Sequence, residues 1–177
     1  MSEPQTTLTY EQIMGLFLET REQIKQTNKD VAGLTSSIGK IIEGMIGGDN
    51  IIDQFQALGY TDLDDFCENK KFRNKKLGIK GEIDLFIENG VIAILVEVKT
   101  TLETADVRKH IQRLENFRRC VDAKGGDKRR FIGAVAGAVI KGDAAEVAIE
   151  NGLYVIVQAG DSFKIVTPPE GFKATEW

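Results

Sequence analysis

The sequence has few of the features that mark secreted or membrane proteins. Only two of its 177 residues are cysteines, and the spacing of Cys67 and Cys120 suits neither a disulfide framework nor a metal-ligand pair. The longest apolar run, FIGAVAGAVI, is too short to cross a bilayer. The first residues, MSEPQTTLTYEQ, contain neither the basic nor the apolar region of a signal peptide. We therefore expect a cytoplasmic protein with reduced thiols.

The net charge is small, but its distribution is uneven. A formal charge of −4 argues against a general polyanion-binding protein. Between Lys70 and Lys141, however, 17 basic residues stand against 9 acidic ones, whereas the rest of the chain has 6 basic and 18 acidic residues. A basic centre between acidic ends fits a nucleic-acid-binding surface, and solvated lysines on loops are the alternative explanation.

An apolar heptad pattern runs through the first third of the chain. Apolar residues or threonines recur at alternating steps of 3 and 4 over more than four heptads. We predict a coiled-coil arm over residues 1–38 that assembles copies of the chain, with a dimer favoured, and a separate domain over residues 39–177. A long helix that buries the same stripe against its own domain is the alternative. The a positions hold Phe17, Ile24, Val31, Ile38 and Met45, and the d positions hold Ile13, Thr20, Thr27, Leu34 and Ile41.

The remaining sequence alternates between strand and helix patterns. Period-two patterns predict strands over the two halves of EIDLFIENGVIAILVEVK and over 67–76, where a loop is the alternative. A buried strand is predicted over 129–140, and further strands over 153–158 and 163–166. Helical spacing predicts helices over 104–122 and 142–152. The expected order is helix, three strands, helix, strand, helix and two strands, which indicates an α/β domain with helices on the faces of a sheet.

The hairpin in this segment carries charges among apolar residues. If Asn89 and Gly90 form a two-residue type I′ loop, paired residue numbers sum to 179. Because side chains alternate along a strand, Asp84, Glu97 and Lys99 then emerge on one face, opposite an unbroken apolar face.

Two neighbouring carboxylates repel each other unless a cation bridges them. Oxygen ligands of this kind suit Mg²⁺ or Mn²⁺, and a lysine on the same face could hold or activate a water for attack on phosphorus. An ion pair in which Lys99 neutralises Glu97 is the alternative.

The pattern Asp84 … Glu97-Val98-Lys99 resembles the D…E-x-K signature of the PD-(D/E)XK nucleases, the restriction-endonuclease-like superfamily. The surrounding order of elements is similar to the αβββαβ core of that fold over about residues 40–160. The resemblance implies a mixed sheet flanked by helices. Ile83 stands where the signature has proline, a variation that the superfamily tolerates.

The whole chain also resembles a family of uncharacterised bacterial proteins with a heptad-rich front, assigned to this superfamily by motif. The shared segments are the VEVK strand at Val96–Lys99, the GAVAG strand at Gly133–Gly137 and the GFK…W end at Gly171–Trp177. The helix after the hairpin lacks a Q-x-x-x-Y motif, because Asn116 lies four residues after Gln112. That departure argues against an exonuclease of the RecB-like branch.

The superfamily resemblance implies roles for five residues. Asp84 and Glu97 would be metal ligands, with the Val98 carbonyl as a third ligand, and Lys99 would position or activate the water. Glu43, in GKIIEGM, is the candidate for a further glutamate on the first core helix. The implied cofactor is Mg²⁺ or Mn²⁺.

Further residues are candidates for contact with nucleic acid. A basic face on the strand over 67–76 could follow a phosphate backbone without regard to sequence, although ordinary surface lysines would look the same. On the helix after the hairpin, the single histidine and its basic neighbours could touch a phosphate, or the histidine could simply be solvated. These candidates are Lys70, Lys71, Arg73, Lys75, Lys76, Lys109, His110 and Arg113.

The sequence therefore predicts a metal-dependent phosphodiesterase, a magnesium-dependent nuclease that acts on DNA and assembles through its N-terminal helix. The alternative is a non-enzymatic coiled-coil module that keeps the nuclease fold and binds nucleic acid or protein without cutting.

Overall fold

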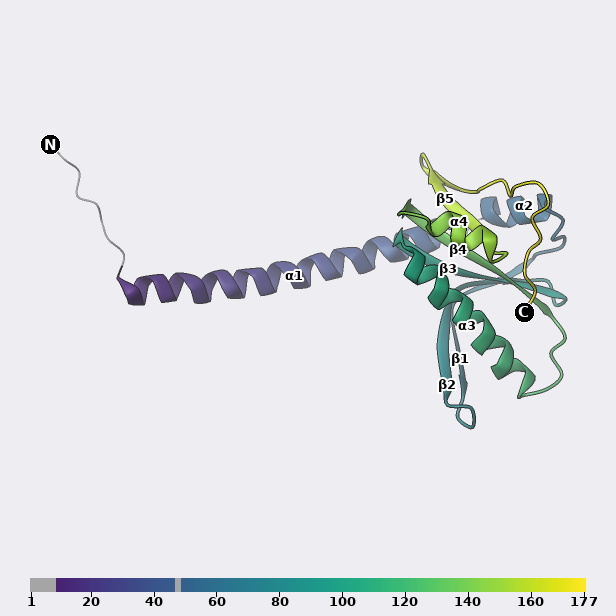
Figure 1. Ribbon diagram of the computed structural model, residues 1–177, viewed down its shortest axis with the longest axis horizontal. Coiled ribbons are helices and arrows are strands. Elements are labelled where there is room, and N and C mark those ends of the chain that lie inside the picture. Colours follow the sequence, from purple (N-terminus) through teal and green to yellow (C-terminus); the bar gives the residue numbers. More distant parts are fainter. Residues whose placement is uncertain (1–8, 47–48) are drawn as a thin grey trace. The chain divides into compact units, whose positions relative to one another are not determined.

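The chain forms two compact units, Met1–Ile38 and Gly39–Trp177, which are described in turn. The computed structural model describes the backbone of residues 9–46 and 49–177 and the side chains of residues 9–29 and 50–177 (Figure 1). Within these residues, no helix combines the length and the apolar character needed to cross a membrane.

Helix α1 (Tyr10–Ile46) begins with a reciprocal cap. The Thr9 N–H donates to Gln12 Oε1 at 2.9 Å, and the Gln12 N–H donates to Thr9 Oγ1 at 3.3 Å. Every side chain described in residues 9–29 is exposed, and the a-position residues Phe17 and Ile24 are 67% and 57% exposed. The apolar stripe of the described part of α1 therefore lies open to solvent.

The second unit has the predicted order of helix, three strands, helix, strand, helix and two strands. The first strand begins two residues earlier than predicted, and the others agree within a few residues. The elements are α2 (Asp49–Ala57), β1 (Asp65–Asn74), β2 (Ile79–Glu88), β3 (Ile92–Leu102), α3 (Thr104–Asp122), β4 (Arg130–Ile140), α4 (Ala144–Glu150), β5 (Tyr154–Ala159) and β6 (Ser162–Ile165).

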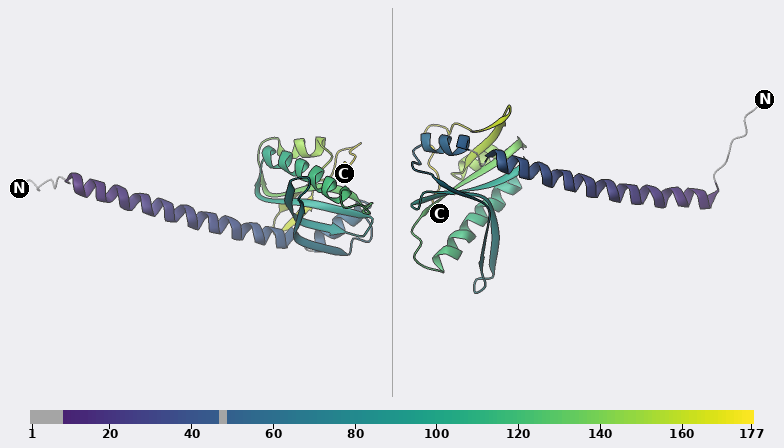
Figure 2. Two further views of the ribbon diagram at one scale, coloured as in Figure 1. Left: turned by 90° about the horizontal axis from the view of Figure 1, so that it is seen from below. Right: turned by 180° about the vertical axis from the view of Figure 1, so that it is seen from behind.

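The six strands form one mixed sheet in the order of the chain, β1-β2-β3-β4-β5-β6. The central pairs β3–β4 and β4–β5 are parallel, and the other pairs are antiparallel. Helices α3 and α4 make the two parallel crossovers and cover one face, while α2 lies on the other (Figure 2). The prediction of a mixed α/β sheet flanked by helices is confirmed.

The core on the α3 face is built from apolar side chains of the sheet and both crossover helices. Leu114 and Phe117 of α3 pack with Leu95, Phe131 and Val135 from the central strands. Phe117 makes an edge-to-face contact with Phe131, with ring centroids 5.0 Å apart. This packing fixes α3 over the centre of the sheet.

The C-terminal residues dock on the beginning of β4. Trp177 and Phe131 exchange two backbone hydrogen bonds, of 3.2 and 3.0 Å. Gly133 leaves room for the Trp177 ring, because a Cβ there would lie 3.1 Å from that ring and closer still to Leu114 and Leu153. Trp177 thus helps to cover the apolar layer beside β4.

The β1–β2 hairpin is longer than the part of it that joins the sheet. β1 and β2 pair from Asp65–Glu88 to Asn74–Ile79, whereas β2 and β3 pair only from Leu85–Val96 to Glu88–Ala93. The far half of the hairpin consequently extends beyond β3 (Figure 1).

Candidate active site

The turn between β2 and β3 is shifted by one residue from its predicted place. The Asn89 N–H donates to the Ile92 carbonyl at 3.1 Å, so Gly90 and Val91 are the two central residues. The Asn89 side chain accepts the N–H groups of Val91 and Ile92 at 3.0 and 2.8 Å. Gly90 has a φ of 81°, and glycine with positive φ at the first central position is the type II′ pattern rather than the predicted type I′ pattern.

This shift changes the pairing but not the faces. Leu85 pairs with Val96, so paired residue numbers sum to 181 instead of the predicted 179. The difference of two is even, so the side chains of the paired segment, from Leu85 to Glu88 and from Ala93 to Val96, keep their predicted faces of the sheet. Extended by one residue beyond Leu85–Val96, the observed register sets Asp84 opposite Glu97, whereas the predicted register sets Asp84 opposite Leu95.

Strand β2 separates from β3 at Asp84. The ladder ends at Leu85–Val96, and the next acceptor is a side chain: Asp84 Oδ2 accepts the Val98 N–H at 2.8 Å. Asp84 therefore bridges the two strands at the point where they diverge. We call this point, where Asp84, Glu97, Val98 and Lys99 meet, the fork.

The hairpin twists sharply at the same level. Asn69, which falls between the β1–β2 pairs on either side of Asp84, has a φ of 52°. Between this left-handed residue and the tip, side chains that would otherwise point away from α3 point towards it, and the reverse. Ile83 packs in the α3-side core with Phe86 and Leu95, so the prediction of an unbroken apolar face opposite Asp84, Glu97 and Lys99 is wrong.

Glu97 is a nearly buried carboxylate with a cation on each oxygen. Its side chain is 3% exposed, Lys99 Nζ lies 2.5 Å from Oε1, and Arg113 of α3 contacts Oε2. A carboxylate at this depth is stable as an anion only when it is paired. The ion pair between Lys99 and Glu97 that the sequence allowed is therefore present, with Arg113 as a second partner.

The Lys99 ammonium lies among three oxygen atoms. Besides Glu97 Oε1, its Nζ donates to the Val98 carbonyl at 3.1 Å and lies 3.9 Å from Asp84 Oδ2. The Lys99 side chain is 36% exposed, so the ammonium has a route to solvent. One cation thus already sits between the residues predicted to be metal ligands.

His110 is fully buried beneath Glu97. Its Nε2 is 3.1 Å from the Leu95 carbonyl and must carry the proton, because the carbonyl can only accept. Its Nδ1 has no hydrogen-bond partner among the described residues and lies 3.8 Å from Glu97 Oε2. Burial lowers the pKa of His110 to about 4, and the positive charge of Lys99 acts in the same direction. A phosphate cannot reach this side chain, so the prediction that His110 contacts nucleic acid is wrong.

The sequence contained a signal for this burial. His110 lies three residues after Val107 and four before Leu114, on the helical stripe that faces the sheet. The buried residues of α3 are Val107, His110, Leu114, Phe117 and Cys120, whereas Ile111 and Val121 are only partly buried. The buried stripe of α3 therefore includes the histidine.

The fork brings together only part of the predicted site. Asp84, Glu97, Val98 and Lys99 meet there, and Arg113 joins them as a partner of Glu97 rather than as a free phosphate ligand. Glu43 belongs to α1, but its side chain lies outside the described residues. Lys109 is 3.6 Å from Asp106, and the basic residues of β1 belong to the hairpin.

The donor set at the fork fits a hard divalent cation. Asp84 Oδ1 has no partner within the described part of the chain, and Glu97 Oε1 and the Val98 carbonyl share their present partner, the Lys99 ammonium. All three donors are oxygen atoms, the type that Mg²⁺ and Mn²⁺ prefer. In the described residues there is no group of three or more histidine, cysteine or carboxylate side chains that could hold a metal, so the carbonyl and water would have to complete any coordination.

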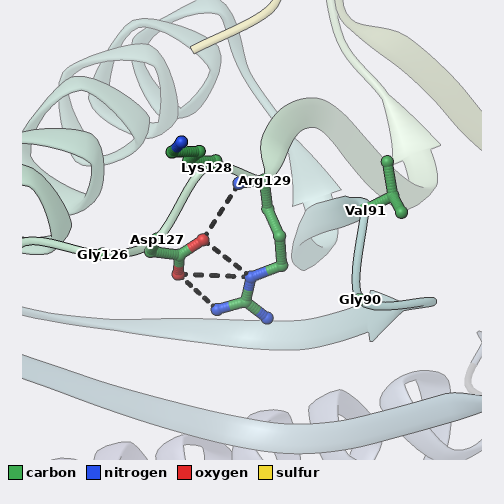
Figure 3. Close-up of a pocket in the computed structure, with 6 residues that line it drawn as sticks. All are labelled: Gly90, Val91, Gly126, Asp127, Lys128 and Arg129. Atoms are coloured by element: carbon green, nitrogen blue, oxygen red, sulfur yellow. Dashed lines mark hydrogen bonds and ion pairs between the residues drawn. The ribbon is translucent and has the colours of Figure 1, made fainter.

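A second charged cluster lies beside the β2–β3 turn (Figure 3). Arg129 donates through Nε and Nη2 to Asp127 at 3.0 and 2.5 Å, and it also contacts Glu88. Lys70 belongs to the same cluster, because its Nζ lies 3.7 Å from Glu88 and 3.4 Å from the centre of the Phe86 ring. These charges pair with one another and connect the loop before β4 to the hairpin, which leaves Lys70 poorly placed for a phosphate.

Similarity to known proteins is low throughout the chain. No protein-family model matches the sequence. No curated protein matches it either. Among solved structures, the EndoMS–dsDNA2 complex is similar at 16% sequence identity and a TM-score of 0.35, over 67% of this chain and 45% of that chain. This chain therefore matches less than half the length of that protein, and the chemistry of its site is inferred from its own residues.

Proposed function

We propose that this protein is a metal-dependent phosphodiesterase of the restriction-endonuclease-like class that acts on DNA. The observation that supports the proposal is the shared cation at the fork: one ammonium lies 2.5 Å from Glu97 Oε1, 3.1 Å from the Val98 carbonyl and 3.9 Å from Asp84 Oδ2. The order of helices and strands around the fork also agrees with the αβββαβ core that the D…E-x-K signature implies.

In this proposal Asp84, Glu97 and the Val98 carbonyl hold Mg²⁺ or Mn²⁺. Such an ion would supply a Lewis acid for the scissile phosphate and would make a bound water more acidic. The Lys99 ammonium would orient the attacking water and stabilise the negative charge that develops on the phosphoryl oxygens. Arg113 pairs with Glu97 and orients it, and the buried His110 ring excludes water from behind the carboxylate.

Binding of Mn²⁺, measured by calorimetry, tests the site directly. We expect wild type to bind the ion and the Asp84→Asn, Glu97→Gln variant to lose binding. The amides keep the shapes of both side chains, and the amide oxygen at position 84 would still accept the Val98 N–H. Asp161→Asn, at an exposed carboxylate in the β5–β6 turn, is the control and should bind as wild type does. Cleavage of plasmid DNA should require Mg²⁺ or Mn²⁺ and stop in the double variant.

A second candidate function has an observation of its own. Both Glu97 oxygens already contact cations of the same chain, Lys99 and Arg113, so the cluster is balanced in charge without an added ion. This favours a module that binds DNA or protein without cutting. If wild type binds no Mn²⁺ even when DNA is present, the module is the correct function and the enzyme is not.

Assembly of copies through α1 belongs to the same proposal. The exposed a-position residues Phe17 and Ile24 would be buried against a second copy of the helix, with a dimer favoured. Two catalytic units held together in this way could act on both strands of one duplex.

A further inference from the structure

The far half of the β1–β2 hairpin is a supported two-stranded ribbon. On its inner face, the Phe72 ring meets Phe117 of α3 edge to face, with centroids 5.1 Å apart. Gly81, directly opposite Phe72, leaves space for that ring, because a Cβ there would overlap it. At the tip, the Asn74 side chain accepts the N–H groups of Lys76 and Leu77 at 3.0 and 3.1 Å. The ribbon is therefore anchored at its inner face and closed at its end.

The outer face of this ribbon carries unpaired positive charge. Arg73 and Lys80 are directly opposite each other in the ladder, and Lys75 and Lys76 follow in the turn. All four are exposed, and none has an ion pair within the described part of the chain. Like charges at opposite ladder positions destabilise a hairpin, so this arrangement weakens the free protein and suits a bound polyanion.

The ribbon also has dimensions that suit duplex DNA. A two-stranded ribbon fits the major groove of B-form DNA, which is about 12 Å wide. From Asp84 to Ile79, where β2 begins, the strand covers five steps, or roughly 17 Å, enough to reach across a groove while the fork stays near a backbone. A protein partner would need an apolar centre on the contact surface, and the outer face at the Arg73–Lys80 pair is charged instead.

We propose that the far half of the β1–β2 hairpin lies in the major groove of duplex DNA, with Arg73 and Lys80 contacting phosphates on its walls and Lys75 and Lys76 at its tip. This inference rests on the proposed function and specifies its substrate: B-form duplex rather than single-stranded DNA or RNA.

The test is binding of the full chain to labelled nucleic acids in a buffer that contains a chelator. The chelator removes divalent ions, so the nucleic acid is not cleaved. Fluorescence anisotropy would compare a DNA duplex of about two helical turns, the same sequence as a single strand, and the same sequence as duplex RNA, each over a range of salt concentrations. The variant is Arg73→Ala, Lys80→Ala. The matched control is Lys164→Ala, Lys173→Ala, which removes two exposed cations elsewhere in the same unit, one of them in β6 at the opposite edge of the sheet.

We expect the hairpin variant to bind duplex DNA about tenfold more weakly and to lose about two from the salt slope, one for each phosphate contact. The control should bind as wild type does. The hairpin variant should bind duplex RNA as strongly as wild type does, because the A-form major groove is too narrow for the ribbon. The variant should unfold at the same temperature as wild type or a higher one, since a repulsive pair has been removed.

Equal losses in the hairpin and control variants, or no loss in either, would overturn the proposal. An equal loss for single-stranded DNA or duplex RNA would overturn it as well, because those results show contact with phosphates outside a B-form groove. Failure of catalysis is a separate result: Mn²⁺ binding and plasmid cleavage depend on the fork, whereas these titrations contain no free divalent ion.

Discussion

The carboxylates of Asp84 and Glu97 stabilise the fold at the fork, in addition to the catalytic roles proposed for them. Asp84 replaces a backbone acceptor by taking the Val98 N–H, and Glu97 holds Lys99 and Arg113 in place. Removing either carboxylate by alanine substitution would therefore leave the Val98 N–H without its acceptor, or Lys99 and Arg113 without their shared anion, and an unsatisfied backbone donor costs about 1–3 kcal/mol. Loss of activity in such variants would mix lost chemistry with lost structure, which is why amides are the better substitutions.

Burial of His110 predicts a specific loss of stability in acid. Its pKa is lowered from 6.5 to about 4 in the folded protein. Between these values the unfolded chain binds a proton that the folded chain does not, so the free energy of unfolding falls as the pH falls. The part due to His110 should reach about 3 kcal/mol near pH 4. Urea unfolding from neutral pH to pH 4.5 should show a steeper decline in wild type than in His110→Gln. Identical pH profiles would contradict a neutral, buried imidazole.

Gly81 is expected to tolerate no side chain. A methyl group there would overlap the Phe72 ring, which is itself packed against Phe117. Gly81→Ala should lower the free energy of unfolding by about 1–3 kcal/mol in chemical denaturation. Gly15→Ala is the control, because a new methyl group at that helical position meets no atom within 4 Å. Wild-type stability in Gly81→Ala would show that the ring can move aside freely.

Among the elements, α1 makes the simplest prediction about assembly. Phe17 occupies an a position and Leu18 the neighbouring b position, and the two are similarly exposed, at 67% and 60%. If the heptad stripe joins copies, Phe17→Asp should reduce the sedimenting mass to that of one chain at roughly 20 μM, because a buried charge opposes the seam. Leu18→Asp, outside the seam, should leave the oligomer intact. A wild-type monomer at that concentration would exclude the arm as an assembly device.

The hairpin shows how far an element can be predicted from its sequence. Alternation predicted both strands and the shared face of Asp84, Glu97 and Lys99. The Asn-Gly dipeptide alone did not decide between a type I′ and a type II′ turn. The Asn89 side chain accepts the N–H groups of Val91 and Ile92, which places Gly90 at the first central position of the turn. The twist at Asn69 was also unforeseen: asparagine tolerates a positive φ, but nothing in the neighbouring residues demanded it.

For the whole molecule, chain order was predictable and spatial pairing was less so. Periodicity marks each element, yet the length over which β2 stays beside β3 depends on where Asp84 interrupts the ladder. The excess of positive charge between Lys70 and Lys141 was visible in the sequence, but which of these cations form ion pairs within the chain could not be predicted from it. In the structure Arg113 and Arg129 are held in ion pairs, while Arg73 and Lys80 remain without one among the described residues. Only three-dimensional contacts separate structural cations from those available to a partner.

The strand order of the sheet has a consequence for synthesis of the protein. Every strand from β1 to β6 lies beside the strands that precede and follow it in the chain. Such an arrangement requires no late strand to insert between two earlier ones, so each strand can pair with its predecessor as it leaves the ribosome. The fork at Asp84 needs only β2 and β3, and Glu97 is buried when the next element, α3, packs over it. The strands that form the site therefore precede in synthesis the helix that closes it.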